Sequence, residues 1–296
     1  MRKILLTALL AAGGLTASAQ NLPNGDFQQW KTTCGKSDQT SLNNYYESAP
    51  FGLATRPGVE PQDWNGSNVN QTVFNQNAHS DALVTRQGNA ENFYVRLVCT
   101  KVGALGITAE APAFINFGTP WVYAVSNKSK CDGGVYGGMS FSYKPDAIKG
   151  RYKRTPAATK EKARIIAYLW SGTFKSSIPS GKSTRMQDDV DRAIMGRVSG
   201  VTGDGKLVAS CDYGFETTKN NDWEEIVVPI KYKRTDVVPT KMNVIISSDD
   251  YWTRGNMVEN SKLEVDDVQF VYYHALKNVT YNGKPIEVKE NESQFY

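Results

Sequence analysis

The chain has 296 residues, of which 40% are hydrophobic and 22% charged, and its formal net charge is +4. This length can bury a large core as one β domain or as two small ones, and we expect one. The lysines and arginines are scattered, and removal of Arg2 and Lys3 would bring the charge from +4 to +2. This charge distribution argues against nucleic acid as a partner.

The first nineteen residues have the pattern of a secretory signal peptide. Arg2 and Lys3 precede an apolar run from Ile4 to Leu15, and the small residues Ala17-Ser18-Ala19 follow it. We expect cleavage after Ala19, and the next residue is Gln20 rather than the cysteine of a lipoprotein. No other segment approaches the ~18 apolar residues of a membrane span. The sequence therefore predicts a soluble protein that is secreted to the periplasm or to the outer cell surface.

Four cysteines would enter an oxidising compartment after export, namely Cys34, Cys99, Cys131 and Cys211. They could form two disulfides, with three pairings open. Cys99 and Cys211 share strand faces with apolar residues, so buried free thiols are an equal alternative.

Alternation of polar and apolar residues is the dominant pattern along the chain. Between Asn92 and Lys101, for example, every second residue from Phe93 to Cys99 is apolar, which predicts a half-buried strand. Similar segments occur around Met139, Phe141 and Tyr143, and at Ala163 to Trp170, Lys206 to Tyr213, Trp223 to Ile230, Met242 to Ser248 and Lys262 to Tyr273.

Other local signals are few. Gly203-Asp204-Gly205 predicts a hairpin turn between Val198-Ser199 and Leu207-Val208, and Gln187 to Met195 has a short helical period. Many strands without interleaved helices indicate an all-β fold, an antiparallel β-sandwich of jelly-roll, galactose-binding-like type. No low-complexity linker divides it, so we expect a single domain over residues 20–273.

The last predicted strand holds two carboxylates, Asp266 and Asp267, within an apolar segment. Calcium takes about six to eight oxygen ligands, and in sandwiches of this kind an N-terminal loop and the last strand often share such an ion. Asp26 would supply the N-terminal oxygen, although Gln28 stands where a second acid would strengthen the site. A structural Ca²⁺ is thus a candidate cofactor, and the alternative is that the two acids cap a bulge or pair with a lysine.

Several short motifs, taken in order, resemble the PCMD family of carbohydrate metabolism domains. They cover roughly residues 21–273, and the resemblance implies a jelly-roll sandwich similar to carbohydrate-binding modules in exported proteins of glycan-degrading bacteria. It implies no catalytic residues. The motifs are Asn24-Gly25-Asp26-Phe27 with Trp30, Pro61-Gln62-Asp63-Trp64, Gly137 to Pro145, Ala163 to Trp170, Ser247-Ser248-Asp249-Asp250 and Ser261 to Val268.

Residues 274–296 continue past the last predicted strand of the sandwich. Val279 to Ile286 has an Asn-Gly turn at Asn282-Gly283, which predicts a hairpin. So short a segment cannot bury a core of its own, so it either adds to the sandwich or forms a tail. We favour the tail.

The sequence gives little support for catalysis. His79 and His274 are the only histidines, and neither lies in a nucleophile or zinc motif. Ser180-Gly181-Lys182-Ser183-Thr184 lacks the first glycine of a phosphate-binding loop. Glycosidase chemistry needs two carboxylates at a defined distance. Glu224-Glu225 and Asp249-Asp250 are candidates only because they are acids, since the sequence does not give the distance between carboxylates.

Sugar binding requires aromatic rings that stack on pyranose faces beside polar groups that bond to hydroxyls. Tyr251 and Trp252 are the best candidates, because Asp249 and Arg254 adjoin them; Trp64 and Trp121 are further candidates in polar loops. Core packing is the alternative for each ring. Trp30, Trp170 and Trp223 lie beside or within strands and are expected in the core.

The sequence thus predicts a secreted, non-catalytic, carbohydrate-binding protein of polysaccharide utilisation, with a glycan or glycoconjugate as partner. One alternative is a glycoside hydrolase. Another is an adhesive or structural surface module that binds a cell-surface protein by strand addition.

Overall fold

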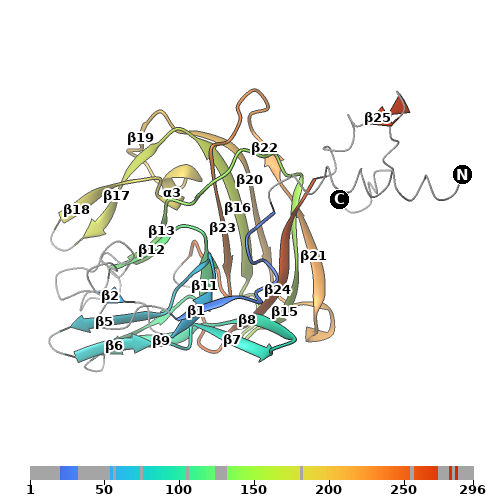
Figure 1. Cartoon of the computed structure of the whole chain (residues 1–296). Coiled ribbons are helices and arrows are strands. Elements are labelled where there is room, and N and C mark those ends of the chain that lie inside the picture. The colour runs from blue at the N-terminus through green and yellow to red at the C-terminus, as the bar shows by residue number, and fades with distance from the viewer. Residues whose placement is uncertain are drawn as a thin grey trace, which may run out of the picture.

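The computed structural model (Figure 1) describes residues 21–32, 54–55, 58–73, 76–104, 107–123, 132–180, 183–253, 257–272, 280–281 and 284–285. The predicted signal peptide, Cys34, Cys131, Arg254 and His274 lie outside these ranges. Strands dominate the described residues, and no helix among them is long and apolar enough to cross a membrane.

Two antiparallel sheets form the body of the protein. The larger has the order β22 (Lys231–Tyr232), β20 (Lys206–Phe215), β16 (Ala163–Ser171), β23 (Lys241–Ser247), β11 (Phe114–Asn116) and β4 (Asn65–Gly66), and β14 (Met139–Ser140) also pairs with β23. The smaller has the order β21 (Glu224–Pro229), β15 (Ala147–Thr155), β24 (Lys262–Val271), β8 (Asn92–Val98) and β7 (Val84–Asn89).

The chain crosses repeatedly from one sheet to the other, as from β15 to β16, from β20 to β21 and from β23 to β24. This connectivity is that of a jelly roll. The predicted all-β antiparallel sandwich is therefore confirmed.

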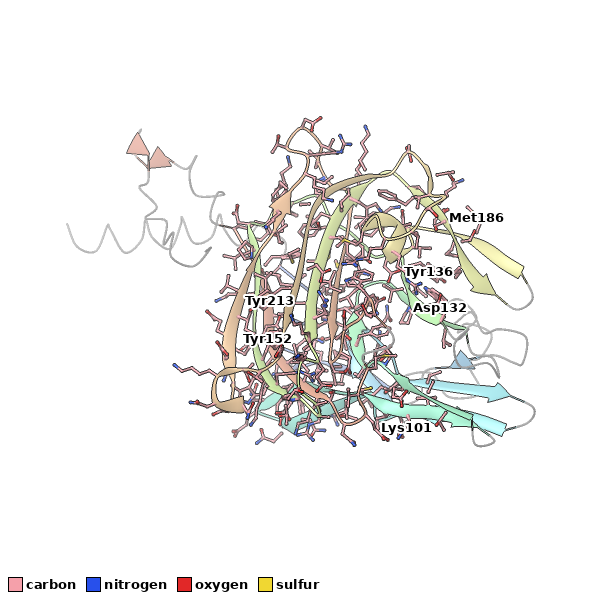
Figure 2. The ribbon with its side chains drawn as sticks, turned by 180° about the vertical axis from the view of Figure 1, so that it is seen from behind. Lys101, Asp132, Tyr136, Tyr152, Met186 and Tyr213 are labelled. Atoms are coloured by element: carbon pink, nitrogen blue, oxygen red, sulfur yellow. The ribbon has the colours of Figure 1, made fainter. Side chains whose placement is uncertain are left out.

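The main core lies between the two sheets. Along β16, Ile165, Ala167 and Leu169 point into it, and Tyr152 of β15 joins them from the opposite sheet, as Figure 2 shows for Tyr152. Alternation with a period of two is what directs these side chains to one face. Burial of this apolar surface, at about 25 cal/mol per Å², is the main stabilising term of the fold.

Among the described residues, several strands and two short helices lie outside the two large sheets. They are β1 (Trp30–Thr32) with β3 (Val59–Pro61); β2 (Ala54–Thr55), β5 (Val69–Val73) and β6 (Gln76–Ser80); β9 (Thr100–Ala104) with β10 (Ile107–Ala111); β12 (Thr119–Tyr123) with β13 (Asp132–Tyr136); β17 (Phe174–Ser180), β18 (Ser183–Asp188) and β19 (Thr202–Gly203); β25 (Thr280–Tyr281) with β26 (Lys284–Pro285); the α-helix α3 (Asp191–Ile194) and the 3₁₀ helix η3 (Lys219–Asn221).

Two local predictions need correction. The turn at Gly203-Asp204-Gly205 joins β19 to β20, but β19 pairs with β17, so the predicted hairpin does not form. The helical period from Gln187 gives only the four-residue α3, because residues up to Asp188 pair as β18 with β17. In both places the β17 strand supplies backbone partners that the local pattern does not reveal.

Cys99 and Cys211 are free and buried, so the structure supports the buried-thiol alternative for both and excludes a bridge to either. A pairing of Cys34 with Cys131 falls outside the described residues. At the C-terminal end, Thr280 pairs with Pro285 and Tyr281 with Lys284, as expected for the hairpin, while its relation to the sandwich stays a prediction.

A second hydrophobic cluster covers the outer face of the larger sheet. Ile166, Tyr168 and Trp170 of β16 point outward and are buried together with Ile194 of α3. Figure 1 shows α3, β12, β13 and β17 on this side, away from β15 and β21. Elements outside the sandwich therefore cover part of this outer face, and Tyr251 and Trp252 pack against the same cluster.

Candidate functional site

The candidate site is centred on Trp252, in the loop that follows β23. The indole Nε1 of Trp252 donates to Asp212 Oδ2 at 2.9 Å. Arg164 Nη1 and Arg197 Nη2 donate to the same carboxylate at 3.0 and 2.6 Å. Asp212 therefore fixes the aromatic ring and two guanidinium groups in one place.

Strand register explains why these groups meet. Arg164 of β16 lies beside Gly214 of β20, and the next outward pair is Ile166 with Asp212. Paired residues of an antiparallel ladder share a face, so Arg164 and Asp212 both project outward. From this position Arg164 Nε also donates to Asp250 Oδ1, in the loop, at 2.9 Å.

Arg197 covers part of the Trp252 ring. Its guanidinium carbon lies 4.3 Å from the ring centroid, which is a close cation–π contact. The Arg197 side chain remains 40% exposed, whereas those of Arg164, Asp212 and Asp250 are 15–21% exposed. These five residues, Trp252, Arg164, Arg197, Asp212 and Asp250, form what we call the Trp252 patch.

Tyr251 anchors the loop to α3. Its hydroxyl donates to Asp191 Oδ2 at 2.5 Å, and its ring packs edge-on against Trp252 and Phe114. Burial raises the pKa of Asp191, and the neighbouring Arg192 and the Tyr251 hydroxyl partly offset this rise. Tyr251 is thus a positioning residue, since its polar end is committed to a buried carboxyl.

The predicted site residues separate into distinct environments. Tyr251 and Trp252 are partly buried on the outer face, as expected of a ligand-binding loop. Asp249 points the other way: it is buried, its Oδ2 accepts from Ser248 Oγ at 2.8 Å, and burial raises its pKa to about 6. It therefore cannot contact a ligand beside Trp252. Arg254 lies outside the described residues.

Trp64 and Trp121 are not the exposed rings that the sequence suggested. Trp64 is fully buried, its centroid lies 4.0 Å from that of Phe117, and its Nε1 donates to the carbonyl of Pro23 at 3.0 Å. Trp121 is 2% exposed and packs with Ile178 and Val190. Core packing, the alternative for both, is what the structure shows, because distant segments fold over their polar loops.

Trp170 is fully buried, as predicted, whereas Trp223 is only partly so. The ring of Trp223 packs edge-on against Tyr94 on the smaller sheet, 5.2 Å away, and Arg151 lies 5.5 Å above it.

Sequence analysis missed Arg164, Asp212 and Arg197. The signal for the first was present, since Arg164 alternates with the inward Ala163 and Ile165 in a predicted strand. Its pairing with Asp212 required the register of β16 and β20, which no local pattern contains.

The three acids expected to hold calcium lie in different surroundings, and calcium binding stays a prediction. Asp26 is exposed, and Asp267 points toward Arg151 with 3.8 Å between Nη1 and Oδ2. Asp266 is buried beside Asn92. The amide nitrogen of Gln28 already bonds the Asp26 carbonyl at 2.6 Å and the Phe93 carbonyl at 3.1 Å. Within the described ranges no three acid, histidine or cysteine side chains gather as metal ligands.

The chemistry available at the Trp252 patch is recognition of a polyhydroxylated ligand. An indole ring offers an apolar face to a pyranose, and the adjoining guanidinium and carboxylate groups offer donors and acceptors to its hydroxyls.

Comparison with known proteins leaves the family open. No family model matches the chain, so membership of the PCMD family stays a prediction. No curated protein matches it either.

Among solved structures, the chain is similar to a "putative glycoside hydrolase" from Bacteroides vulgatus, with 13% identity over 86% of this chain and 98% of that one and a TM-score of 0.47. A second protein so described, from Bacteroides thetaiotaomicron, shares 12% identity over 77% and 89% of the two chains, with a TM-score of 0.42. A family 11 carbohydrate-binding module from Clostridium thermocellum, in complex with a β-1,3-1,4-mixed-linked tetrasaccharide, shares 10% over 71% and 89%, with a TM-score of 0.30. Similarities this distant do not indicate which residues of this chain bind a ligand or catalyse a reaction.

Proposed function

We propose that this protein is a secreted, non-catalytic glycan-binding protein of a polysaccharide-handling system, and that the Trp252 patch is its binding site. One observation carries the proposal: a partly exposed indole ring is held in place by Asp212, with Arg164, Arg197 and Asp250 around it. The N-terminal pattern of residues 1–19 supports secretion.

The patch is also suited to binding because its geometry is set before a ligand arrives. Asp212 fixes the indole nitrogen and both guanidinium groups, and the Tyr251 hydroxyl holds the loop from the other side. Fewer side-chain rotamers are then lost on binding, and this preorganisation favours affinity.

A glycoside hydrolase is the second candidate, because Asp212 and Asp250 flank Arg164 beside the ring and hydrolysis needs two carboxyl groups. Binding is the better account. Both carboxylates are ion-paired with Arg164, and Asp191, a nearby acid with a raised pKa, is fully buried behind Tyr251. A general acid must be able to reach the glycosidic oxygen.

Glycan-array screening followed by calorimetric titration of the strongest ligand tests the proposal. We expect Trp252→Ala to weaken binding by about tenfold or more, since the stacking surface is lost and Asp212 loses the hydrogen bond that it accepts from the indole N–H. Trp223→Ala is the matched control: that ring is also partly buried, but it lies on the smaller sheet, and its loss should leave affinity unchanged.

Release of reducing sugar from pooled polysaccharides, abolished by Asp250→Ala, would instead favour the hydrolase. Equal affinity in the wild type and Trp252→Ala, with both proteins folded, would place the site elsewhere.

A further inference from the structure

The Trp252 patch is electrically balanced. It holds two guanidinium groups and two carboxylates, and every one of them is paired inside the patch: Arg164 with Asp212 and Asp250, and Arg197 with Asp212. The distances are 2.6–3.0 Å, so these are charge-assisted hydrogen bonds rather than loose ion pairs.

This balance disfavours an anionic ligand. The carboxylate of a uronic acid, or a sulfate, only accepts hydrogen bonds, so it would have to take donors from Arg164 or Arg197. Even at N–H groups that are not yet engaged, the anion would lie close to the carboxylates of Asp212 and Asp250, whose negative charges already neutralise the two guanidinium groups. Like charges brought together in a partly buried site are a general means of rejecting the wrong partner.

A neutral sugar meets no such cost. A hydroxyl both donates and accepts, and the patch places guanidinium N–H groups directly beside carboxylate oxygens. Arginine carries five N–H donors, and the hydrogen bonds formed by the described residues engage Nε and Nη1 of Arg164 and Nη2 of Arg197. The remaining N–H groups can bind hydroxyls while the ion pairs stay intact.

We propose that the Trp252 patch selects uncharged glycans and discriminates against glycans that carry carboxylate or sulfate groups, with the paired Asp212 and Asp250 as the residues that reject the charge. This inference rests on the proposed function, and it adds the class of ligand. Because the patch has no net charge, binding should depend little on ionic strength.

Calorimetric titration with pairs of oligosaccharides tests the proposed selectivity. One member of each pair is neutral, and the other is the same oligosaccharide with its C6 groups oxidised to carboxylates or sulfated. We expect the neutral member to bind about tenfold tighter or more. Its affinity should change less than about twofold between 50 and 500 mM NaCl.

A charge-removing variant sharpens the test. Asp250→Asn leaves a net positive patch, so the ratio of the two affinities should shift several-fold toward the acidic member. Asp222→Asn is the control, because Asp222 is an exposed acid that pairs with Lys153 of the smaller sheet, and it should alter neither affinity.

The outcomes separate the two proposals. Tighter binding of the acidic member that is lost in Trp252→Ala would overturn the inference and leave the proposed function standing. Failure of Trp252→Ala to weaken any glycan, or the absence of any bound glycan, would overturn the proposed function and the inference with it. If the Asp250→Asn variant still discriminates against the acidic member as strongly as wild type, Asp250 does not contribute to the selectivity.

Discussion

At the scale of single residues, burial disfavours the charged form of Asp249 and Asp266, as it does for Asp191. Burial raises the pKa of both Asp249 and Asp266 to about 6, and for Asp266 the adjacent charge of Asp267 adds to the rise. The charged groups near Asp249, Arg154 and Glu161, are themselves buried, whereas those near Asp266, namely Asp267 and Arg151, are exposed. Asp266 also accepts hydrogen bonds from the Asp267 backbone N–H at 2.9 Å and the Asn92 amide at 3.5 Å. Because its charged neighbours are in contact with solvent, Asp266 is the clearer case for a test.

The pH dependence of Asp266 follows from linkage. The folded protein holds this proton more tightly than the unfolded chain, so stability falls as pH rises from about 4 to about 6, and the full penalty applies above that. We expect Asp266→Asn to be more stable than wild type by about 1 kcal/mol at pH 7.5 and equal to it near pH 4. Urea unfolding at both pH values measures this.

The exposed Asp236→Asn serves as the control and should show no such dependence. A stability difference between Asp266→Asn and wild type that is the same at both pH values would contradict the assignment.

At the scale of elements, the loop from β23 to β24 is held on both sides of the larger sheet. Asp249 turns inward toward Arg154, and Tyr251 turns outward to Asp191 of α3. Trp252 follows directly, so its orientation depends on both anchors. A short helix that was barely visible in the sequence thereby positions the candidate binding loop.

Removal of the outward anchor should uncouple the loop from the sheet. We expect Tyr251→Phe to lose about 1–3 kcal/mol of unfolding free energy, because Asp191 stays buried without its hydroxyl donor. Glycan affinity should fall several-fold while the far-UV circular dichroism spectrum is retained.

Tyr213→Phe is the matched control, since the Tyr213 side chain is 41% exposed on β20 (Figure 2), and it should change neither quantity. Unchanged stability and affinity in Tyr251→Phe would show that α3 does not position the loop.

At the scale of the whole molecule, the jelly roll brings the N-terminal segment against the last strand of the sandwich, where Asp26, Asp266 and Asp267 do not gather as one cluster of acids. The Val268 N–H donates to the Gly25 carbonyl at 2.8 Å, and a β-carbon on Gly25 would lie 1.9 Å from the Val268 carbonyl oxygen. This contact is a close backbone approach that only glycine permits. The side-chain amide of Gln28 donates hydrogen bonds to the carbonyls of Asp26 and Phe93.

Calcium should consequently have no effect on overall stability. We expect the thermal midpoint to agree within about 1 °C in CaCl₂ and in EDTA, because an ion stabilises a fold only if the folded state binds it. Differential scanning calorimetry of the same preparation in both buffers decides the matter. A rise of several degrees in calcium would mean that Asp26, Asp266 and Asp267 do gather around an ion.

Alternation of polar and apolar residues was enough to predict the fold class and most of the large strands. Alternation is a local property, so the strands at Ala163 to Trp170 and Lys206 to Tyr213 were predicted from their one apolar face. It failed at the central strand β15 (Ala147–Thr155), where Gly150 and the buried Arg154 occupy inward positions and break the apolar pattern. The Tyr251-Trp252 loop was chosen as a candidate from the sequence because aromatic and charged residues are adjacent there, and its role in binding stays a prediction.

Contacts between distant segments determine which rings are accessible and which charges meet. Trp64 and Trp252 look alike in sequence, each in a polar loop, yet Phe27 and Phe117 enclose the first while the second stays at the surface. The joining of Arg164, Asp212 and Trp252 depends on the register of β16 with β20 and on the loop after β23. Burial and ion pairing arise between segments far apart in the chain, and a local pattern carries no information about such contacts.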